Sequence, residues 1–272
     1  DMNGYGHFLP GQLWFQAYYA GIAVLLGVAA YLGWTRGTPS GWRDRVAGAR
    51  ERATPRVGAL AGIAAAATVA LGGFIFYNTN ILNHYRTSHD REARQADYEK
   101  KYRALDGAPQ PRVTAVNMAV DLFPREQRVR MHGTLGLVNR NAVAVDTIHL
   151  FWAQGEDVAV KSIDFGVPAT LVTDDPYIGL RSYRLATPLA PGATLTMAID
   201  AQVATHGFRN SDSNTAVVFN GSFVNGLFVL PVIGYDERGE LVSDRDRAKY
   251  GLKPKERMRD RDDPAGLAHN VL

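Results

Sequence analysis

The chain has 272 residues, of which 46% are hydrophobic, and its 30 basic and 27 acidic side chains give a net charge of +3. This small surplus does not predict a nucleic-acid-binding protein, so no nucleic acid is expected among its partners. The chain contains no cysteine, which excludes a cysteine nucleophile and a disulfide framework.

Two uncharged apolar stretches lie close together near the N-terminus. Residues 13–34 and 57–77 contain no Asp, Glu, Lys, Arg or His. At about 1.5 Å rise per residue, each covers the ~30 Å hydrocarbon core of a bilayer. The sequence therefore predicts a transmembrane α-helical hairpin over residues 1–82, with the lipid bilayer as its partner. Gly58 and Gly62 have the GxxxG spacing that permits close approach of another helix.

The loop between the two stretches predicts the orientation of the hairpin. Residues 35–56 carry six arginines against Asp44 and Glu51, whereas the segment before the first stretch has no Lys or Arg. The positive-inside rule places this loop in the cytoplasm and both ends outside. We therefore expect a bacterial inner-membrane protein with its soluble part in the periplasm. Residue 1 is Asp and no signal peptide precedes the first stretch, as expected for an excerpt of a longer protein.

A polar helix is expected to continue from the second stretch. Residues 83–111 are interpreted as a helical stalk and a Pro-rich break, with helix over 78–106 and Tyr98, Tyr102 and Leu105 at helical spacing. Glu99 and Arg103 form an acid-before-base pair four residues apart, as do Asp97 and Lys101. Gly107, Pro109 and Pro111 end the helix. His84 and His89 are five residues apart and do not share a helical face, so a metal pair is not predicted.

From residue 112 the hydrophobic period changes to two. Short alternating segments separated by turn residues, such as 124–126 and 139–141, predict strands. Residues 112–236 are therefore predicted to form an all-β domain, either an antiparallel sandwich or a saddle-shaped sheet, that is independent of the hairpin. Residues 237–272 are interpreted as a charged linker, in which 243–263 is an exposed segment or a solvated helix.

The sequence contains no catalytic motif. HExxH, GxSxG, a P-loop and a GxGxxG turn are all missing, so no catalytic, cofactor-binding or metal-ligating residue is assigned. His132 and His149 lie on predicted strands and are interpreted as structural or surface residues. Asp174 and Asp175 are compatible with a cation-binding loop, but a solvated turn is favoured. Asn220-Gly221-Ser222 matches a glycosylation sequon, and a tight Asn-Gly turn is the favoured interpretation.

Several segments resemble a bacterial family in which an ABC-type permease is fused to a zinc aminopeptidase of the alanyl-aminopeptidase (gluzincin) type. These segments are FIFYNTNILNHYRTSHDREARQADYEKKYRALDGAPQPRVTAVNMAVDLFP (74–124), GTLGLVNRNAVAVDTIHLFW (133–152), YRLATPLAPGATLTMAI (183–199) and NGSFVNGLFVLPVIGYDERGEL (220–241). The last departs from ordinary soluble members, which have a longer loop before the catalytic domain. The resemblance implies that the chain is the last membrane hairpin and the N-terminal β domain of such a fusion.

What the resemblance implies is a supporting role. The family's zinc ligands, its general base and its Gly-Ala-Met-Glu-Asn exopeptidase motif match no position here. The chain itself is expected to hold no cofactor, with zinc in a domain downstream of it. Its expected partners are other permease helices and that downstream peptidase domain, which would cover an apolar patch. Candidates for this patch are Phe219, Phe223, Phe228 and Leu230, with core packing as the alternative.

Two other interpretations remain open. The chain is equally compatible with a membrane-anchored periplasmic β-sandwich that serves as a binding or scaffold module of a transporter. It is also compatible with a permease accessory domain whose peptidase partner is degenerate. The presence or absence of HExxH downstream of Leu272 separates these interpretations.

Overall fold

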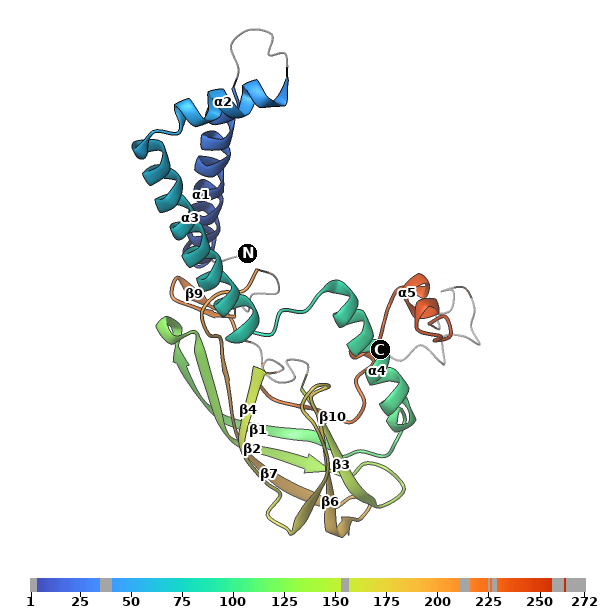
Figure 1. Ribbon diagram of the computed structural model, residues 1–272. Coiled ribbons are helices and arrows are strands. Elements are labelled where there is room, and N and C mark those ends of the chain that lie inside the picture. Colours follow the sequence, from blue (N-terminus) through green and yellow to red (C-terminus); the bar gives the residue numbers. More distant parts are fainter. Residues whose placement is uncertain are drawn as a thin grey trace. The chain divides into compact units, whose positions relative to one another are not determined.

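A computed structural model describes residues 4–34, 41–152, 157–210, 216–224, 226, 229–255 and 262. The chain forms two compact units, which are described separately (Figure 1). The first, here the helical unit, contains residues 1–85, 123–128 and 204–223. The second, here the β unit, contains residues 86–122, 129–203 and 224–272. The expected boundaries of 1–82 and 112–236 therefore differ from these two units, because each unit draws on segments far apart in the sequence.

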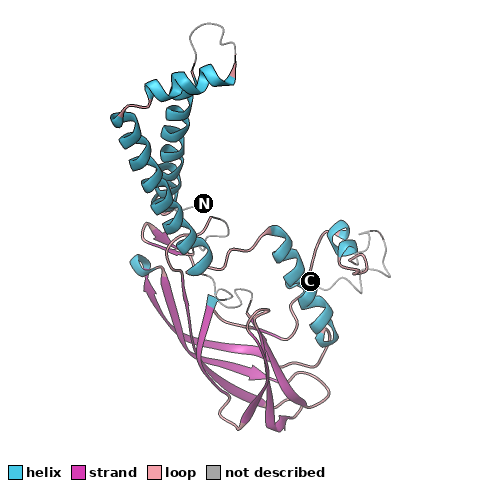
Figure 2. Cartoon of the chain, viewed as in Figure 1, coloured by secondary structure: helices cyan, strands magenta, loops and turns pink. Residues whose placement is uncertain are grey.

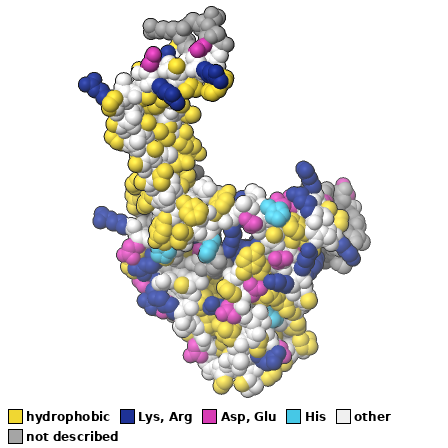
Figure 3. Space-filling view, viewed as in Figure 1, with side chains coloured by type: hydrophobic (Ala, Val, Ile, Leu, Met, Phe, Trp, Pro, Cys, Tyr) yellow, Lys and Arg dark blue, Asp and Glu magenta, His cyan; other side chains and the backbone are white. Residues whose placement is uncertain are grey.

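The helical unit is built on two long apolar helices. Helix α1 covers Leu9–Gly33 and helix α3 covers Pro55–Phe76. Both are long and apolar enough to cross a membrane, and their side chains form an almost uncharged surface in Figure 3. The Thr54 hydroxyl accepts the Val57 N–H at 3.4 Å and so caps the start of α3. The basic segment expected as a loop contains a further helix, α2, over Trp42–Arg52.

Small residues allow α1 and α3 to approach each other closely. A Cβ atom added at Gly72 would lie 3.1 Å from the Tyr18 ring, and one added at Gly21 would collide with the Thr68 hydroxyl. Gly58 and Gly62, which carry the GxxxG spacing, have no described atom within 4 Å of an added Cβ. The α1–α3 contact therefore uses Gly21 and Gly72, and the GxxxG face does not take part in it.

The expected continuous stalk over 78–106 is interrupted. After the π-helical turn η1, Tyr77–Ile81, the chain leaves the helix, and α4 begins anew at Ser88–Tyr102. Polar side chains explain the interruption, because the Asn78 and Thr79 side chains bond back to the Phe74 and Ile75 carbonyls at 2.9 Å. Thr87 and Asp90 then form a capping box that starts the new helix.

A loop that follows strand β7 binds the end of α3 within the helical unit. The Asn83 amide donates to the His206 carbonyl at 2.8 Å, and its oxygen accepts from Arg209 Nε at 2.8 Å. Gly207 has φ +59°, and an added Cβ would collide with the Asn78 side chain. This group of residues is called the Asn83 junction below.

An aromatic side chain extends the Asn83 junction into the helix pair. The Phe208 ring centroid lies 5.9 Å from that of Phe15 on α1 and 6.0 Å from that of Phe74 on α3. Gly11 leaves room for it, because a Cβ there would lie 3.2 Å from Phe208 Cβ. The loop is therefore held by polar contacts on one side and aromatic packing on the other.

The β unit contains two four-stranded sheets, as the alternating pattern predicted (Figure 2). The strand order is β1-β2-β7-β4 in one sheet and β10-β3-β6-β5 in the other. The strands are β1 Arg112–Phe123, β2 Arg128–Val138, β3 Val145–Phe151, β4 Val158–Asp164, β5 Ala169–Asp175, β6 Leu180–Leu189, β7 Thr194–Ala204 and β10 Val232–Ile233. The pairs β3–β6, β5–β6, β4–β7 and β3–β10 are antiparallel.

The predicted turns are present. Residues Pro124–Glu126 form a 3₁₀ turn before β2, and the buried Asn139 amide bonds to the Val143 and Leu189 carbonyls at 2.8 Å. Residues 217–222 form a small hairpin of β8 Val217–Val218 and β9 Gly221–Ser222. Its two central residues are Phe219 and Asn220, and Gly221 is already paired in β9, so a tight turn is present one residue before the expected Asn-Gly pair.

Strand β1 lies at a sheet edge and is exposed along most of its length. Ala115 faces Gly136, because a Cβ added to that glycine would lie 3.1 Å from Ala115 Cβ. Gly136 lies between the buried residues Leu135 and Leu137, so Ala115 is on the opposite face from their side chains. The even-numbered residues of β1 alternate with Ala115 and therefore lie on the same face of the sheet as Leu135 and Leu137. This face is apolar, yet Val116 is 60% exposed on it. Val120 and Leu122 are also exposed.

The segment expected as a charged linker is packed against the β unit as far as Lys255. It contains a 3₁₀ turn, η6 Glu237–Gly239, and a short helix, α5 Asp244–Lys249. Glu240 and Arg247 are 1% and 2% exposed. The described residues 243–255 are mostly exposed and include α5, as the solvated-helix interpretation predicted, but that interpretation did not include the buried ion pairs of Glu240 and Arg247.

The Asn83 junction predicts unequal effects of two glycine substitutions. Gly207→Ala should lower the midpoint of thermal unfolding of the full chain in detergent micelles, because it combines a left-handed φ with a collision against Asn78. Gly192→Ala is the matched control: Gly192 has φ +76° but no atom within 4 Å of an added Cβ. We expect the free energy of unfolding of the control to fall only by the cost of placing alanine in a left-handed backbone conformation, about 1 kcal/mol. Equal shifts in the two variants, measured by near-ultraviolet circular dichroism, would contradict the close contact.

Candidate functional site

Helix α4 packs on the β unit through one aromatic residue. Tyr98 is 2% exposed, and its ring stacks on Tyr235 with centroids 4.9 Å apart and planes 3° apart. The Phe151 ring of β3 lies 4.8 Å away, and the Tyr98 hydroxyl accepts the Asp236 N–H at 2.8 Å. Burial raises the pKa of the Tyr98 hydroxyl, so it stays protonated at neutral pH. The helical spacing predicted that Tyr98 and Tyr102 lie together, and they do.

A buried ion pair lies one residue further along the helix. Both terminal nitrogens of Arg247 contact Glu99: Nη2 lies 2.6 Å from Oε1, and Nη1 lies 2.8 Å from Oε2. The Arg247 guanidinium also donates to the Leu241 and Lys253 carbonyls at 2.7 and 2.6 Å. Both side chains are less than 5% exposed. The ion pair between Glu99 and Arg247 therefore binds α5 and the chain on either side of it to α4.

A second buried carboxylate extends this cluster. Glu240 accepts from the Tyr235 hydroxyl at 2.8 Å, from Arg103 at 2.9 Å and from Lys255 at 3.0 Å. Burial alone would raise the pKa of Glu240, but the bonds from Lys255 and Tyr235 and the charge of Arg103 outweigh it and lower the pKa. The predicted pair of Glu99 and Arg103 is present at 3.1 Å and joins the two carboxylates through one cation.

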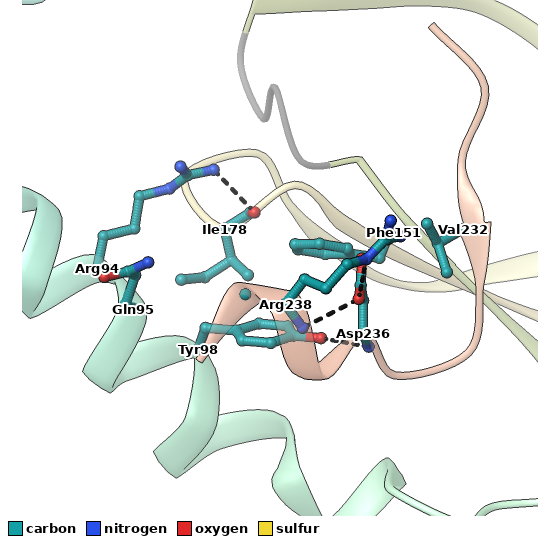
Figure 4. A pocket seen from close by; sticks show the side chains of 9 residues that line it. Arg94, Gln95, Tyr98, Phe151, Ile178, Val232, Asp236 and Arg238 are labelled. Carbon is teal, nitrogen blue, oxygen red and sulfur yellow. Dashed lines mark hydrogen bonds and ion pairs between the residues drawn. The ribbon is translucent and has the colours of Figure 1, made fainter. Parts of the chain in front are cut away.

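A pocket of about 300 Å³ opens beside Tyr98 and is called the α4 pocket below. Figure 4 shows Tyr98 and Ile178 between Arg94 and Gln95 on one side and Asp236 and Arg238 on the other. The lining residues come from α4, β3, the turn before β6, β10 and η6; they are Arg94, Gln95, Tyr98, Phe151, Ile178, Val232, Asp236, Arg238 and Gly239. Its inner wall is apolar and its rim is polar, which is the usual composition of a ligand pocket.

The rim of the α4 pocket is fixed by hydrogen bonds. Arg94 donates to the Tyr177 and Ile178 carbonyls at 2.6 and 3.0 Å. Arg238 makes two side-chain contacts with Asp236, at 2.8 and 2.9 Å. Gly239 lies so close to Tyr98 that an added Cβ would be 2.8 Å from its ring. Contacts within the protein therefore fix the rim.

The lining of the α4 pocket contains aromatic, aliphatic, arginine, glutamine and aspartate side chains. None of the lining residues is Ser, Thr, Cys, Lys or His, so the pocket offers neither a usual nucleophile nor a histidine base.

A Ser–His contact lies outside the pocket, where His149 Nδ1 is 2.8 Å from Ser182 Oγ. These residues face each other across β3 and β6, and Ser182 is 3% exposed, so this pair stabilises the sheet and is closed to a substrate. Burial lowers the pKa of His149, as expected for a structural histidine.

The other residues singled out in the sequence are not brought together. Asp174 binds Arg181 at 2.9 Å, and Asp175 accepts from Tyr102 at 2.8 Å, so protein donors occupy the carboxylates of the predicted acidic loop. His132 lies 3.8 Å from Asp121 on the polar face of its sheet. His84 and His89 are separated by the interruption before α4. Within the described ranges, no group of three or more His, Asp or Glu residues could hold a metal ion.

The expected apolar patch is only partly formed. Phe219 and Phe223 are 57% and 64% exposed, but both belong to the helical unit. Leu230 is half-buried in the β unit, and Phe228 lies outside the described residues. The exposed apolar residues of β1 were not singled out from the sequence, because alternation alone cannot distinguish an edge strand from a covered one.

No model of a known protein family matches the chain. No curated protein matches it either.

The buried pair makes a sharp prediction for stability. Arg247→Leu should destabilise the chain by about 3 kcal/mol, because the buried Glu99 would lose its bidentate partner and keep only its contact with the half-exposed Arg103. The double variant Glu99→Leu/Arg247→Leu should recover part of this loss, since neither charge then remains. Lys249→Met, at an exposed ion pair on the same helix, should change little. Chemical unfolding in detergent micelles measures all three variants, and a double variant no more stable than the single one would contradict the assigned cause.

The lowered pKa of Glu240 makes a prediction for pH dependence. Because the folded pKa lies below the ordinary value of 4.5, the ionised carboxylate stabilises the fold above about pH 4.5. That contribution should be lost as the pH falls through the folded pKa. Unfolding midpoints of the natural chain and of Glu240→Gln should therefore differ at pH 7 and converge as the pH is lowered from 4.5 through the folded pKa. A difference that stays constant with pH would show that the carboxylate does not titrate as expected.

Proposed function

We propose that this chain is the membrane-anchoring, non-catalytic part of a permease-linked zinc aminopeptidase, and that its β unit positions a downstream peptidase domain on the periplasmic side. The observation that carries the proposal is the pairing of two bilayer-length helices with a β unit whose edge strand exposes apolar residues. The sequence resemblance to the permease–aminopeptidase family supplies the identity of the partner. The parent protein would be the enzyme, and this chain would support it.

The membrane role is supported by the surface of the helices. Side chains such as Leu26, Ile63 and Val69 are 65–76% exposed although they are apolar, which is stable in lipid and unfavourable in water. Helix α2 between them carries arginines at positions 43, 45, 50 and 52, which favours the cytoplasmic side for this segment. Both α1 and α3 would pack among further permease helices, and the open GxxxG face of α3 is available for such a contact.

The docking role is supported by β1. Val116, Val120 and Leu122 continue the apolar face formed by the buried residues of β2, but among the described residues nothing covers them. An edge strand of twelve residues also presents unpaired backbone groups on its outer side. A packed neighbouring domain would bury both features, which is the role assigned here to the peptidase domain.

The alternative, a periplasmic binding or scaffold module of a transporter, is favoured by one observation. The α4 pocket is apolar inside and charged at its rim, and a purely structural module does not need such a site. In this alternative no zinc domain follows the chain.

Orientation is tested with reporters. A periplasm-dependent reporter fused after Leu272 should be active, and the same reporter inserted within residues 35–56 should be silent, because the basic segment stays in the cytoplasm. A cytoplasm-dependent reporter at the same two positions is the control and should give the reverse pattern. Activity of the periplasmic reporter only within 35–56 would overturn the orientation.

The partnership with a peptidase is tested by metal content. The natural polypeptide that carries this sequence, extracted from membranes, should contain about one zinc and cleave amino-acid anilides. The 272-residue chain alone should hold no stoichiometric zinc after dialysis, since no described cluster can coordinate it. A natural polypeptide without zinc or peptidase activity would overturn the proposal in favour of the scaffold module. One zinc bound to the isolated chain would overturn the assignment of the metal to a downstream domain.

A further inference from the structure

We propose that the α4 pocket binds the C-terminal residue of a peptide, taking an apolar side chain into the pocket and its free carboxylate at the arginine rim. The inference concerns the β unit alone and does not depend on the presence of a peptidase domain.

The size of the α4 pocket limits its ligand. A volume of about 300 Å³ lies at the lower end of the range for small-molecule sites and suits one large side chain with its backbone atoms. A long acyl chain or a nucleotide would not fit. The inner wall, formed by Tyr98, Phe151, Ile178 and Val232, offers aromatic and aliphatic surface and selects an apolar or aromatic side chain.

The charges at the rim select an anion. The lining contains two guanidinium groups, those of Arg94 and Arg238, and a single carboxylate, that of Asp236. Asp236 is already satisfied, because one oxygen accepts from the Arg238 N–H and Nε and the other from its Nη2, at 2.8–3.1 Å. The Arg238 side chain is 64% exposed, so its guanidinium can still meet a ligand from solvent. A carboxylate is the group that arginine binds most specifically.

The same charges disfavour a free amino acid. An α-ammonium group would need an acceptor, but the Asp236 oxygens are occupied and Gln95 is the remaining neutral polar side chain of the rim. A peptide C-terminus has no such group, because its nitrogen is an amide. A second depression lined by Ser88, Arg91 and Glu92 shares Arg94 and Gln95 with the pocket, and it gives the preceding residues a path along α4.

Three probes test the proposal on the full chain in lipid nanodiscs. They are N-acetyl-L-phenylalanine, its uncharged amide, and L-phenylalanine, and binding is followed by saturation-transfer NMR and competition. We expect the acetylated acid to bind with a dissociation constant of about 1 mM or below, and the amide and the free amino acid about tenfold more weakly.

Variants place the binding in the α4 pocket. Arg238→Gln should weaken the acid about tenfold and leave the amide unchanged, because only the acid uses the charge. Arg128→Gln removes the same charge from an exposed pair with Glu126 outside the pocket and should have no effect. Val232→Trp fills the pocket and should abolish binding of all three probes. Far-ultraviolet spectra check that each variant is folded.

The outcomes decide the proposal. Equal binding of the acid and the amide would overturn carboxylate recognition, and no binding of any probe at about 10 mM would overturn the site. Unchanged binding to a folded Val232→Trp variant would place the ligand elsewhere and overturn it as well. None of these results bears on zinc content or orientation, so failure here is distinguishable from failure of the proposed function.

Discussion

The contact between Glu99 and Arg247 is the constraint on which the β unit depends. It joins residues 148 positions apart and binds the C-terminal segment to α4. Three residues just before this segment contact Tyr98 of the same helix. Tyr235 stacks on its ring, the Asp236 N–H bonds to its hydroxyl, and Gly239 lies close to its ring. The wall of the α4 pocket formed by residues 236–239 is therefore held by these contacts with Tyr98, and the ion pair holds the chain that follows it against the same helix.

A buried ion pair is seldom the most stable solution for a core, because desolvation offsets much of the attraction. Here the cost is reduced by full partnering, since Arg247 also meets two carbonyls and Glu99 also meets Arg103. What the pair adds is specificity: a guanidinium with four fixed acceptors allows one position of α5 along α4, whereas apolar side chains would permit sliding. We expect the geometry of the pocket to be as well defined as that of the ion pair.

Much of the fold could be predicted from period and charge, and the candidate site could not. Uncharged runs indicated α1 and α3, and alternation indicated the long strands, because both signals are local. The break at Leu82–Thr87 was missed although Thr87-Ser88-His89-Asp90 is a capping-box sequence, since the polar run around it also suits a helix. Arg247 lies in a sequence of alternating charges that normally indicates a solvated segment, and its partner is too distant in sequence to be recognised. The α4 pocket is assembled from five separate segments, none with a motif.

The two compact units do not coincide with the domain expected over 112–236. The chain passes between the two compact units near residues 85, 122, 128, 203 and 223. Residues 204–209 leave β7 and enter the Asn83 junction, where Asn83 and Phe208 are held by the ends of the helices. A cut at Gly107 would remove α4, and with it Tyr98 and Glu99, from the core of the β unit.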